Sequence, residues 1–431
     1  MVRMLDLKCG EKTLPLSIAP ERVLSVLRPP IPQPAGSPRE LVERALDSCA
    51  SHLSSFNPGD KVVIVTSDVT RPTGSEVYLP LLVARLNQLG IPDRDIAIVF
   101  ALGIHRKQTE AEHKKIVGEL YGRIALFDHD CDDPGGLVYL GETSNGIPVE
   151  VNRRVAEADR LILTGAVAFH YFAGFGGGRK SLLPGVSSRR SCMASHFSVL
   201  NPGEGNGRNP KAVTANLDGN PVHEAIMEAC AMRPPEFILN TVLAPDKSIL
   251  AVFAGDWKET HLEGCRFYAE AFSAPIAEQA DLVVVSCGGF PKDINVIQAN
   301  KSMTYASRAL KPGGVMIVLA ECRDGYGNAT FFNWFSHATC GELEAALRKR
   351  YEINGQTAWS VKEKAERFRI FLVSQLPPEE VVTMGMTPVE TAQTALALAL
   401  PLLPEDYRAH LIPEGGIVLP VLTPSSPQPF P

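Results

Sequence analysis

The sequence lacks several patterns that mark common classes of protein. It contains no run of about 18 continuous apolar residues, so we expect no membrane-spanning helix. The N-terminal segment has no apolar core of the kind that secretory signal peptides carry. No C-x-x-C pair occurs among the nine cysteines, which argues against a zinc ribbon or a thioredoxin-type centre. We therefore expect a cytoplasmic protein whose cysteines are reduced thiols.

Strongly basic segments are also missing. The net charge is -6 at pH 7, and lysine and arginine form no dense cluster. Nucleic-acid-binding surfaces need such clusters, so we expect no nucleic acid partner. The 431 residues, 45% of them hydrophobic, are enough for two or three globular domains. The expected partners are small molecules, with a homo-oligomer as a further possibility.

Six short apolar runs predict buried parallel strands. They are uniformly apolar rather than alternating, which is typical of strands that are covered on both faces. Helical patterns separate them, and this alternation indicates an α/β fold with mostly parallel sheets. The runs are Lys61–Thr66, Asp95–Gly103, Ala158–Ala166, Ala280–Gly289, Gly314–Glu321 and Arg369–Ser374.

Two helices carry clear boundary signals. Ser75–Leu89 is followed by Gly90 and Pro92, which commonly end helices. The helix predicted over Thr109–Leu120 opens with a T-x-x-E capping box. Residues 201–221, in the middle of the chain, are rich in glycine, asparagine and proline. This composition predicts a long ordered loop over the site.

The strand series breaks near residue 270, which predicts two α/β domains. The first spans residues 1–270 and the second spans residues 271–399, with the active site expected in the cleft between them. A helix over Phe267–Gln279 would lead into the second domain. We expect the segment from about 400 to 431 to pack back on the first domain.

Polar side chains follow the ends of four predicted strands. In open parallel sheets, ligands bind at the carboxyl ends of the strands. After the third of these strands, Ala158–Ala166, three glycines precede Lys180, and glycines let the backbone approach a ligand closely. We therefore expect one cleft to contain Asp68, Arg71, His105, His170, Gly176, Gly177, Gly178, Lys180, Lys292, Asp293, Gln298 and Lys301.

Several of these residues also have a purely structural explanation. Asp68 could cap the following helix, and Arg71 before Pro72 could be a solvated turn residue. A single histidine such as His105 is often structural, and His170 stands among aromatic residues that could bury it. The recurrence of one position after four strands favours a functional site.

The glycine-rich loop before Lys180 does not match common phosphate-binding loops. A Walker A loop has glycine directly before its lysine, whereas Arg179 stands there. The Rossmann fingerprint G-x-G-x-x-G is absent as well, so neither ATP hydrolysis nor NAD binding is predicted. A lysine in such a loop can be a covalent attachment point. His196 could ligate a metal whose other ligands come from a cofactor, because no H-E-x-x-H motif is present.

The stretch FHYFAGFGGGRKSLLPGVSSRRSCMASH resembles the nickel-dependent lactate racemase family, whose members use a nickel-pincer nucleotide. In that family a histidine precedes the cofactor lysine by ten residues, and a nickel-binding histidine follows it by sixteen. His170, Lys180 and His196 have the same spacing here. The motifs DVTRP, GIHR and QANK are similar to further motifs of the family.

The resemblance implies a role for each motif residue. The nickel-pincer nucleotide would be joined through a thioamide to Lys180, and His196 would ligate its nickel. Biosynthetic enzymes must supply this cofactor, so protein made without them is expected to lack it. The acid/base pair would be His105 and His170, the substrate contacts Arg71, Gln298, Lys301 and Trp359, and the cofactor contacts Asp68, Arg71 and the three glycines.

The expected reaction is racemisation or epimerisation of a 2-hydroxy acid, lactate-like or larger, by hydride transfer. The C–H bond beside an anionic carboxylate is barely acidic, so the family removes hydride rather than a proton. A neutral histidine, with an ordinary pKa of about 6.5, takes the hydroxyl proton, and a second one serves the other enantiomer. The alternatives are a non-catalytic nickel-cofactor carrier, which needs no histidine pair, and an NAD-linked dehydrogenase, which needs the missing fingerprint.

Overall fold

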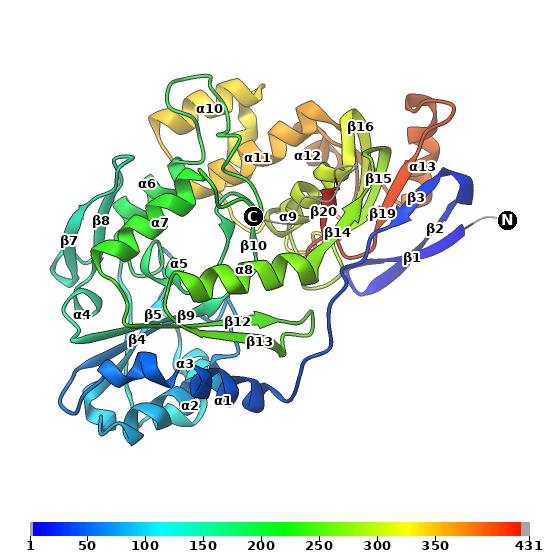
Figure 1. Cartoon of the computed structure of the whole chain (residues 1–431). Helices are drawn as coiled ribbons and strands as arrows, with labels where there is room; N and C mark the ends of the chain where they lie inside the picture. Colours follow the sequence, from blue (N-terminus) through cyan, green and yellow to red (C-terminus); the bar gives the residue numbers. More distant parts are fainter. Residues whose placement is uncertain (1–2, 424–431) are drawn as a thin grey trace. The chain divides into compact units, whose positions relative to one another are not determined.

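The computed structural model describes residues 3–423 and forms two compact units. One unit consists of Ile31–Asn201 and Arg208–Ala269, and we call it the Lys180 unit. The other consists, within the described residues, of residues 3–30, Pro202–Gly207 and residues 270–423, and we call it the Gln298 unit. Each is built on a mainly parallel six-stranded sheet with helices packed against it (Figure 1), which confirms the α/β fold.

The main sheet of the Lys180 unit has the strand order β13-β12-β9-β4-β5-β6. Its neighbours are parallel, except that β12 and β13 are antiparallel. A hairpin, β7–β8, and a very short one, β10–β11, lie outside this sheet. The strands are β4 (Val62–Ser67), β5 (Ile96–Ala101), β6 (Ala125–Asp128), β7 (Leu137–Glu142), β8 (Pro148–Asn152), β9 (Arg160–Ala166), β10 (Phe169–His170), β11 (Gly174–Phe175), β12 (Phe237–Leu243) and β13 (Ile249–Gly255).

Helices cover both faces of this sheet (Figure 1). Apolar side chains of α1, α2 and α3 form one buried cluster with those of β4, β5 and β9. The opposite face is covered by α5, α7 and α8 (Figure 1). The helices are α1 (Pro38–Ser48), α2 (Ser75–Gln88), α3 (Glu110–Val117), α4 (Arg153–Ala156), α5 (Arg179–Leu182), α6 (Arg189–Phe197), α7 (Pro221–Met232) and α8 (Glu259–Phe272), whose last residues belong to the Gln298 unit.

The order of the strands reverses between β4 and β9. From β4 the chain adds β5 and then β6 on one side, whereas β9 and β12 lie on its other side. Such a reversal leaves a crevice at the carboxyl ends of the two strands, where ligands of open α/β sheets bind. The segment after β4 carries Asp68 and Arg71, and the segment after β9 carries His170, in β10, and Lys180, in α5.

The sheet of the Gln298 unit is parallel throughout, with the order β18-β17-β16-β15-β19-β3. The β1–β2 hairpin and α13 bury apolar side chains against one face, and α9 and α11 contact the sheet as well. Its elements are β1 (Arg3–Cys9), β2 (Lys12–Ile18), β3 (Val23–Val26), β14 (Ser273–Ile276), β15 (Ala280–Ser286), α9 (Val296–Ala306), β16 (Leu310–Leu319), α10 (Cys340–Lys349), α11 (Ile353–Arg367), β17 (Arg369–Val373), α12 (Pro378–Thr383), β18 (Thr387–Val389), α13 (Ala392–Ala399), β19 (Ala409–Ile412) and β20 (Leu419–Leu422).

The local signals in the sequence are confirmed. All six apolar runs are parallel strands, namely β4, β5, β9, β15, β16 and β17. The capping box at the start of α3 is formed, because the Thr109 side chain accepts from the Glu112 amide and the Glu112 side chain accepts from the Thr109 amide. Residues 201–220 contain no helix or extended strand. All nine cysteines are free thiols, and within residues 3–423 no helix is long and apolar enough to cross a lipid bilayer.

The predicted boundaries near residue 270 differ from the structure in two respects. The helix ends at Phe272, and Ser273–Ile276 forms β14, which pairs in parallel with β20. Pro275 explains this end, because proline lacks an amide hydrogen and disfavours helical geometry in the residue before it. Residues 3–30 also belong to the Gln298 unit, since β3 pairs with β19 and the β1–β2 hairpin is part of that core.

The C-terminal segment joins the sheet of the Gln298 unit; of the first predicted domain it pairs with β3, not with the sheet of the Lys180 unit. In the Gln298 unit, β19 lies between β15 and β3, and β20 pairs with β14. The reason is that Ala409–Ile412, a fully buried segment with His410 as its one polar residue, pairs in parallel with the side of β15 opposite β16. Residues 424–431, the end of the predicted segment, lie outside the described residues.

Candidate active site

The predicted site residues fall into two groups. Asp68 and Arg71 follow β4, His105 follows β5, and His170, Lys180 and His196 follow β9, all within the Lys180 unit. Gln298, Lys301 and Trp359 belong to the Gln298 unit. The first group can therefore be described as one set of contacts at the carboxyl ends of β4, β5 and β9, at and beside the strand reversal.

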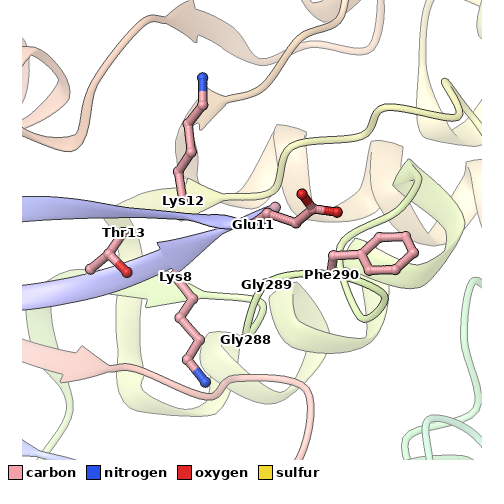
Figure 2. Close-up of a pocket in the computed structure, with 8 residues that line it drawn as sticks. Lys8, Glu11, Lys12, Thr13, Gly288, Gly289 and Phe290 are labelled. Carbon is pink, nitrogen blue, oxygen red and sulfur yellow. The ribbon is translucent and has the colours of Figure 1, made fainter.

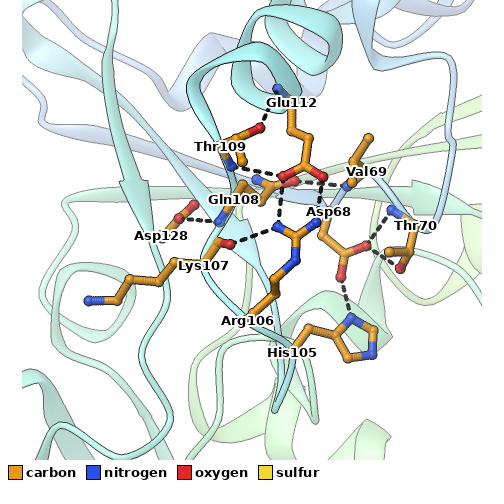
Figure 3. A network of polar contacts seen from close by, with 10 residues as sticks. All are labelled: Asp68, Val69, Thr70, His105, Arg106, Lys107, Gln108, Thr109, Glu112 and Asp128. Carbon is orange, nitrogen blue, oxygen red and sulfur yellow. Dashed lines mark hydrogen bonds and ion pairs between the residues drawn. The ribbon is translucent and has the colours of Figure 1, made fainter. Parts of the chain in front are cut away.

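A buried carboxylate, Asp68, pairs with the imidazole of His105, whose side chain is 39% exposed (Figure 3). The His105 Nδ1 atom lies 2.6 Å from Asp68 Oδ2, and Asp68 is only 4% exposed. The other carboxylate oxygen accepts from the Thr70 amide at 2.7 Å. The structural alternative for Asp68 does not apply, because Gly74 is the N-cap residue of the following helix, α2.

The surroundings of Asp68 keep it ionised. Burial acts to raise the pKa of its carboxyl, but the hydrogen bonds from His105 and Thr70 and the charge of Arg71 outweigh burial and lower it. An ionised Asp68 accepts the Nδ1 proton of His105, so Nε2 is the nitrogen that can accept a proton from another molecule.

His170 lies in the short hairpin formed by β10 and β11. Its Nδ1 atom accepts from the Ala173 amide at 3.2 Å, and its ring is partly exposed rather than fully buried. The loop predicted to cover the site reaches this hairpin, because Asn220 donates to the Phe172 carbonyl at 2.9 Å. The Ala215 amide likewise donates to the Gly174 carbonyl at 3.1 Å.

The ring of Phe172 brings three of the predicted residues together. The His170 ring centroid lies 4.5 Å away in an edge-on arrangement, and the His196 ring centroid lies 5.3 Å away. The Lys180 Nζ atom lies 5.8 Å from the Phe172 centroid. Phe172 is 1% exposed and was not among the predicted site residues. Its position two residues after His170, in an aromatic run, is the only sequence signal that pointed to it.

The Lys180 amine lies in an environment that favours its neutral form. Burial is the main cause that lowers the pKa of Lys180 to about 7, and the positive charges of Arg71 and Arg179 act in the same direction. Near neutral pH a large fraction of the amine is then unprotonated. Only an unprotonated amine can bond covalently to an electrophilic carbon, so Lys180 suits the predicted attachment point.

His196 is oriented as a single metal ligand would be. Its Nδ1 atom donates to the Cys192 carbonyl at 2.9 Å, which leaves the Nε2 lone pair available. Burial, followed by the Lys180 charge, lowers the pKa of His196 to about 3, so the ring is neutral. Within residues 3–423 no group of three or more His, Cys, Asp or Glu side chains could hold a metal ion. A metal at His196 would thus need ligands from a cofactor, as predicted.

Replacing His196 with alanine is expected to lower the nickel content of cofactor-loaded protein several-fold, because the available Nε2 atom is lost. The measurement is metal analysis of the purified protein by mass spectrometry. His52→Ala, at an exposed histidine in the same unit, is the matched control and should leave nickel content unchanged. Unchanged nickel in the His196 variant would contradict its assignment as a ligand.

The glycine cluster packs tightly against the sheet. Gly177 has a φ of 108°, a conformation that favours glycine, and a side chain there would meet His261 and Asn240 at about 3 Å. A Cβ atom on Gly165 of β9 would lie 2.7 Å from the Gly178 nitrogen. These close contacts explain by packing alone why Gly165 and Gly177 are glycines. The predicted contact of Gly176, Gly177 and Gly178 with a cofactor stays a prediction.

The side chain of Arg179 points into the protein and anchors the start of α5. This role was not predicted from the sequence. Arg179 is 1% exposed, and its guanidinium contacts the rings of His223, at 3.1 Å, and His261. Burial, followed by the charge of Arg179, lowers the pKa of His223 to about 3, and the same causes hold the pKa of His261 well below its ordinary value, so both rings are neutral acceptors. The inward Arg179 fixes the short helix α5, on which Lys180 contacts Phe172.

The predicted substrate residues of the Gln298 unit lie on α9. Gln298 and Lys301 are one helical turn apart, and Lys301 Nζ donates to Gln298 Oε1 at 2.8 Å. Asn295 caps the helix by accepting from the Gln298 amide at 3.0 Å. Trp359 lies within α11 and is 2% exposed; its predicted substrate contact stays a prediction.

A hollow in the Gln298 unit is lined by none of the predicted residues. It lies between the turn of the β1–β2 hairpin and the loop at Gly288 and Gly289. Lys8 and Lys12 extend to opposite sides of the hairpin (Figure 2), so their charges do not converge on one ligand. The predicted catalytic, cofactor-binding and substrate-binding side chains with polar groups therefore lie in the Lys180 unit and on α9.

Comparison with known proteins gives consistent matches over nearly the whole chain. The model of the lactate racemase N-terminal domain matches residues 9–207, and that of the lactate racemase C-terminal domain matches residues 276–419. The lactate racemase of Thermoanaerobacterium thermosaccharolyticum is 32% identical over an alignment of 431 positions, which covers 96% of this chain and 98% of that protein. The lactate racemase of Lactiplantibacillus plantarum is 33% identical over an alignment of 394 positions, which covers 89% of this chain and 91% of that protein.

Solved structures agree with these matches. The lactate racemase apoprotein from Thermoanaerobacterium thermosaccharolyticum has a TM-score of 0.88 and 31% identity, with 97% of this chain and 100% of that chain covered. A protein from Thermotoga maritima has a TM-score of 0.64 at 18% identity, with 92% and 100% covered, and is similar in fold.

Proposed function

Because the chain belongs to the lactate racemase family, we propose that it racemises or epimerises a 2-hydroxy acid with a nickel-pincer nucleotide tethered to Lys180. The observation that best supports this proposal is the arrangement of Lys180, His196 and His170 around the Phe172 ring. An amine with a lowered pKa, an imidazole with an available nitrogen and a partly exposed imidazole are three groups that this reaction needs.

The residues of the Lys180 unit fit the proposed cofactor. Lys180 would hold the nucleotide through a thioamide, and His196 would ligate the nickel through Nε2. When bound, the nucleotide would supply the hydride acceptor that no side chain of a protein provides. The protein itself would bind and orient the 2-hydroxy acid and move its hydroxyl proton.

His105 is the better defined of the two proposed acid/base residues. Its Nε2 atom would accept the hydroxyl proton, while Asp68 on Nδ1 holds the ring and stabilises the positive charge that it gains. His170 is proposed to serve the other enantiomer. In the neutral ring the Ala173 amide donates to Nδ1, so the ring proton lies on Nε2, unlike in His105. To accept the hydroxyl proton at Nε2, His170 would first have to move its own proton to Nδ1 and give up the contact with the Ala173 amide.

Cationic groups would bind the substrate carboxylate. Arg71 is exposed, yet its charge lowers the pKa of both Lys180 and His196, which indicates that its guanidinium lies near them. A guanidinium can grip both oxygens of a carboxylate. Gln298 and Lys301 are also proposed to contact the substrate. The candidate substrates are lactate, malate, longer hydroxy acids and sugar acids.

The proposal is tested with protein produced together with the cofactor-making enzymes. Single enantiomers of 2-hydroxy acids are incubated with it, and the products are separated by chiral chromatography. We expect at least one acid to approach the equilibrium mixture of its isomers. A protein that carries the cofactor but changes no acid would instead be a carrier, and NADH formation would indicate a dehydrogenase.

A further inference from the structure

The pairing of Asp68 with His105 depends on two separate loops. Asp68 is in the loop after β4, and His105 is in the loop after β5. The two strands are parallel neighbours, but their loops leave the sheet in irregular backbone. A side chain that joins the loops would therefore set the distance between carboxylate and imidazole.

Gln108 is such a side chain (Figure 3). Its Oε1 atom accepts from the Val69 amide at 2.8 Å, directly after Asp68 in the chain. Gln108 itself is three residues after His105. Its Nε2 atom is buried and has no hydrogen-bond partner within the described part of the chain. Exchanging the two amide atoms would place two donors face to face, so the acceptor oxygen is what holds Val69.

The backbone of Gln108 is anchored in turn to the edge of the sheet. Its amide donates to Asp128 Oδ2 at 2.8 Å, at the end of β6. The other oxygen of Asp128 lies 2.8 Å from His113 Nε2, and the His113 ring is stacked on Phe100 at 4.7 Å. Gln108 thus connects a rigid strand end to the backbone beside Asp68.

The remaining contacts of the His105 loop run in another direction. Arg106 forms two hydrogen bonds with Glu112 of α3, at 2.8 and 2.7 Å (Figure 3). Glu112 is also the residue that completes the capping box with Thr109. These contacts hold the loop to its own helix and do not reach the segment that carries Asp68.

We propose that Gln108 is a positioning residue of the reaction, which acts through Val69 to hold Asp68 against His105. This inference rests on the proposed function, because it assigns the proton transfer to His105. Without the Gln108 oxygen, the Val69 amide loses its acceptor, and the carboxylate–imidazole pair must hold the Asp68 segment against His105 without this second hydrogen bond between the loops. Small displacements of a catalytic group reduce rates strongly.

The first test is a double-mutant cycle on the cofactor-loaded full chain. Gln108→Met keeps the length of the side chain and removes the acceptor, and should lower kcat about ten-fold. In the Asp68→Asn background the same change should lower kcat by no more than about two-fold. The reason is that the effects of two substitutions are not additive when both residues act through one contact. Equal losses in both backgrounds, or no loss in either, would overturn the proposal.

The second test reads the tautomer of His105 without any cofactor. Nitrogen-15 spectra of histidine-labelled protein distinguish a ring protonated on Nδ1 from one protonated on Nε2, and His105→Gln identifies the signal. The original chain should show the Nδ1–H form, and Gln108→Met should add a clear Nε2–H population. An unchanged tautomer in that variant would contradict the proposal even if no hydroxy acid is ever found to react.

Two further variants keep these tests interpretable. Lys107→Ala changes the neighbouring exposed residue, whose ion pair to Asp130 is 3.4 Å long, and should alter neither rate nor tautomer. Gln108→Leu is the second apolar replacement, to be used if Gln108→Met unfolds at a lower temperature. A chain that racemises normally but shows no coupling would disprove only the role of Gln108. A chain that shows the tautomer change but no racemisation would disprove only the proposed function.

Discussion

Replacing Lys180 with alanine is expected to remove both the covalent cofactor and all measurable racemisation. The amine near Phe172 is the proposed attachment point, and alanine offers no nucleophile in its place. Mass spectrometry of protein produced with the cofactor-making enzymes should show an added mass on the Lys180 peptide of the original chain and none in the variant. Chiral chromatography should show an unchanged enantiomer with the variant.

The matched control for this prediction is Lys115→Ala, at an exposed lysine of α3. It should carry the added mass and racemise at the original rate. An active original chain whose Lys180 peptide is unmodified would refute the tethered cofactor. A Lys180 variant that keeps full activity would refute the attachment site as well.

Removal of either proposed acid/base ring should have the next largest effect. His105→Ala and His170→Ala should each lower kcat by about 10²–10⁴-fold, the usual contribution of a positioned general base. The cofactor should stay bound, because neither ring is the proposed attachment point or metal ligand. Initial rates with each enantiomer, together with the intact mass of the protein, measure both quantities.

The outcome at these histidines separates the competing functions. Near-normal rates in either variant would reject that ring as a catalytic group. Loss of the cofactor along with the rate would instead indicate a structural role at the site. His52→Ala, which is distant in sequence and exposed, should match the original chain in rate and mass.

Much of the fold follows from short-range patterns. Uniformly apolar runs such as Val62–Ser67 could be recognised as parallel strands because both faces of the sheet are covered. The T-x-x-E box placed the start of α3 because its two hydrogen bonds are local. The position of Asp68, His105 and His170 after strand ends followed from the general geometry of open α/β sheets.

The parts that could not be predicted depend on contacts between distant segments. Nothing within Ala409–Ile412 shows that it pairs with β15 rather than with the sheet of the Lys180 unit, because strand partners are chosen by the whole sheet. The same holds for residues 3–30, whose strand β3 completes that sheet. The two pairings join residues that are 127 and 386 positions apart (Leu282 with Ala409, and Val23 with Ala409), so local patterns carry no information about them.

The site shows the same division. The spacing of His170, Lys180 and His196 could be seen in the sequence, whereas the Phe172 ring that joins them could not. Gln108 resembled an ordinary loop residue until its contact with Val69 was known. Such supporting residues have no motif of their own, because only the folded chain brings their partners close.

The most direct measurement follows the hydrogen atom at C2 of the substrate. A single enantiomer carrying deuterium at C2 is incubated in ordinary water with the cofactor-loaded chain, and the isomer formed is analysed by mass spectrometry. Transfer of hydride to the Lys180-bound cofactor and back predicts that the product keeps its deuterium. A product with C2 hydrogen from water, or no product with any 2-hydroxy acid, would contradict the proposed reaction.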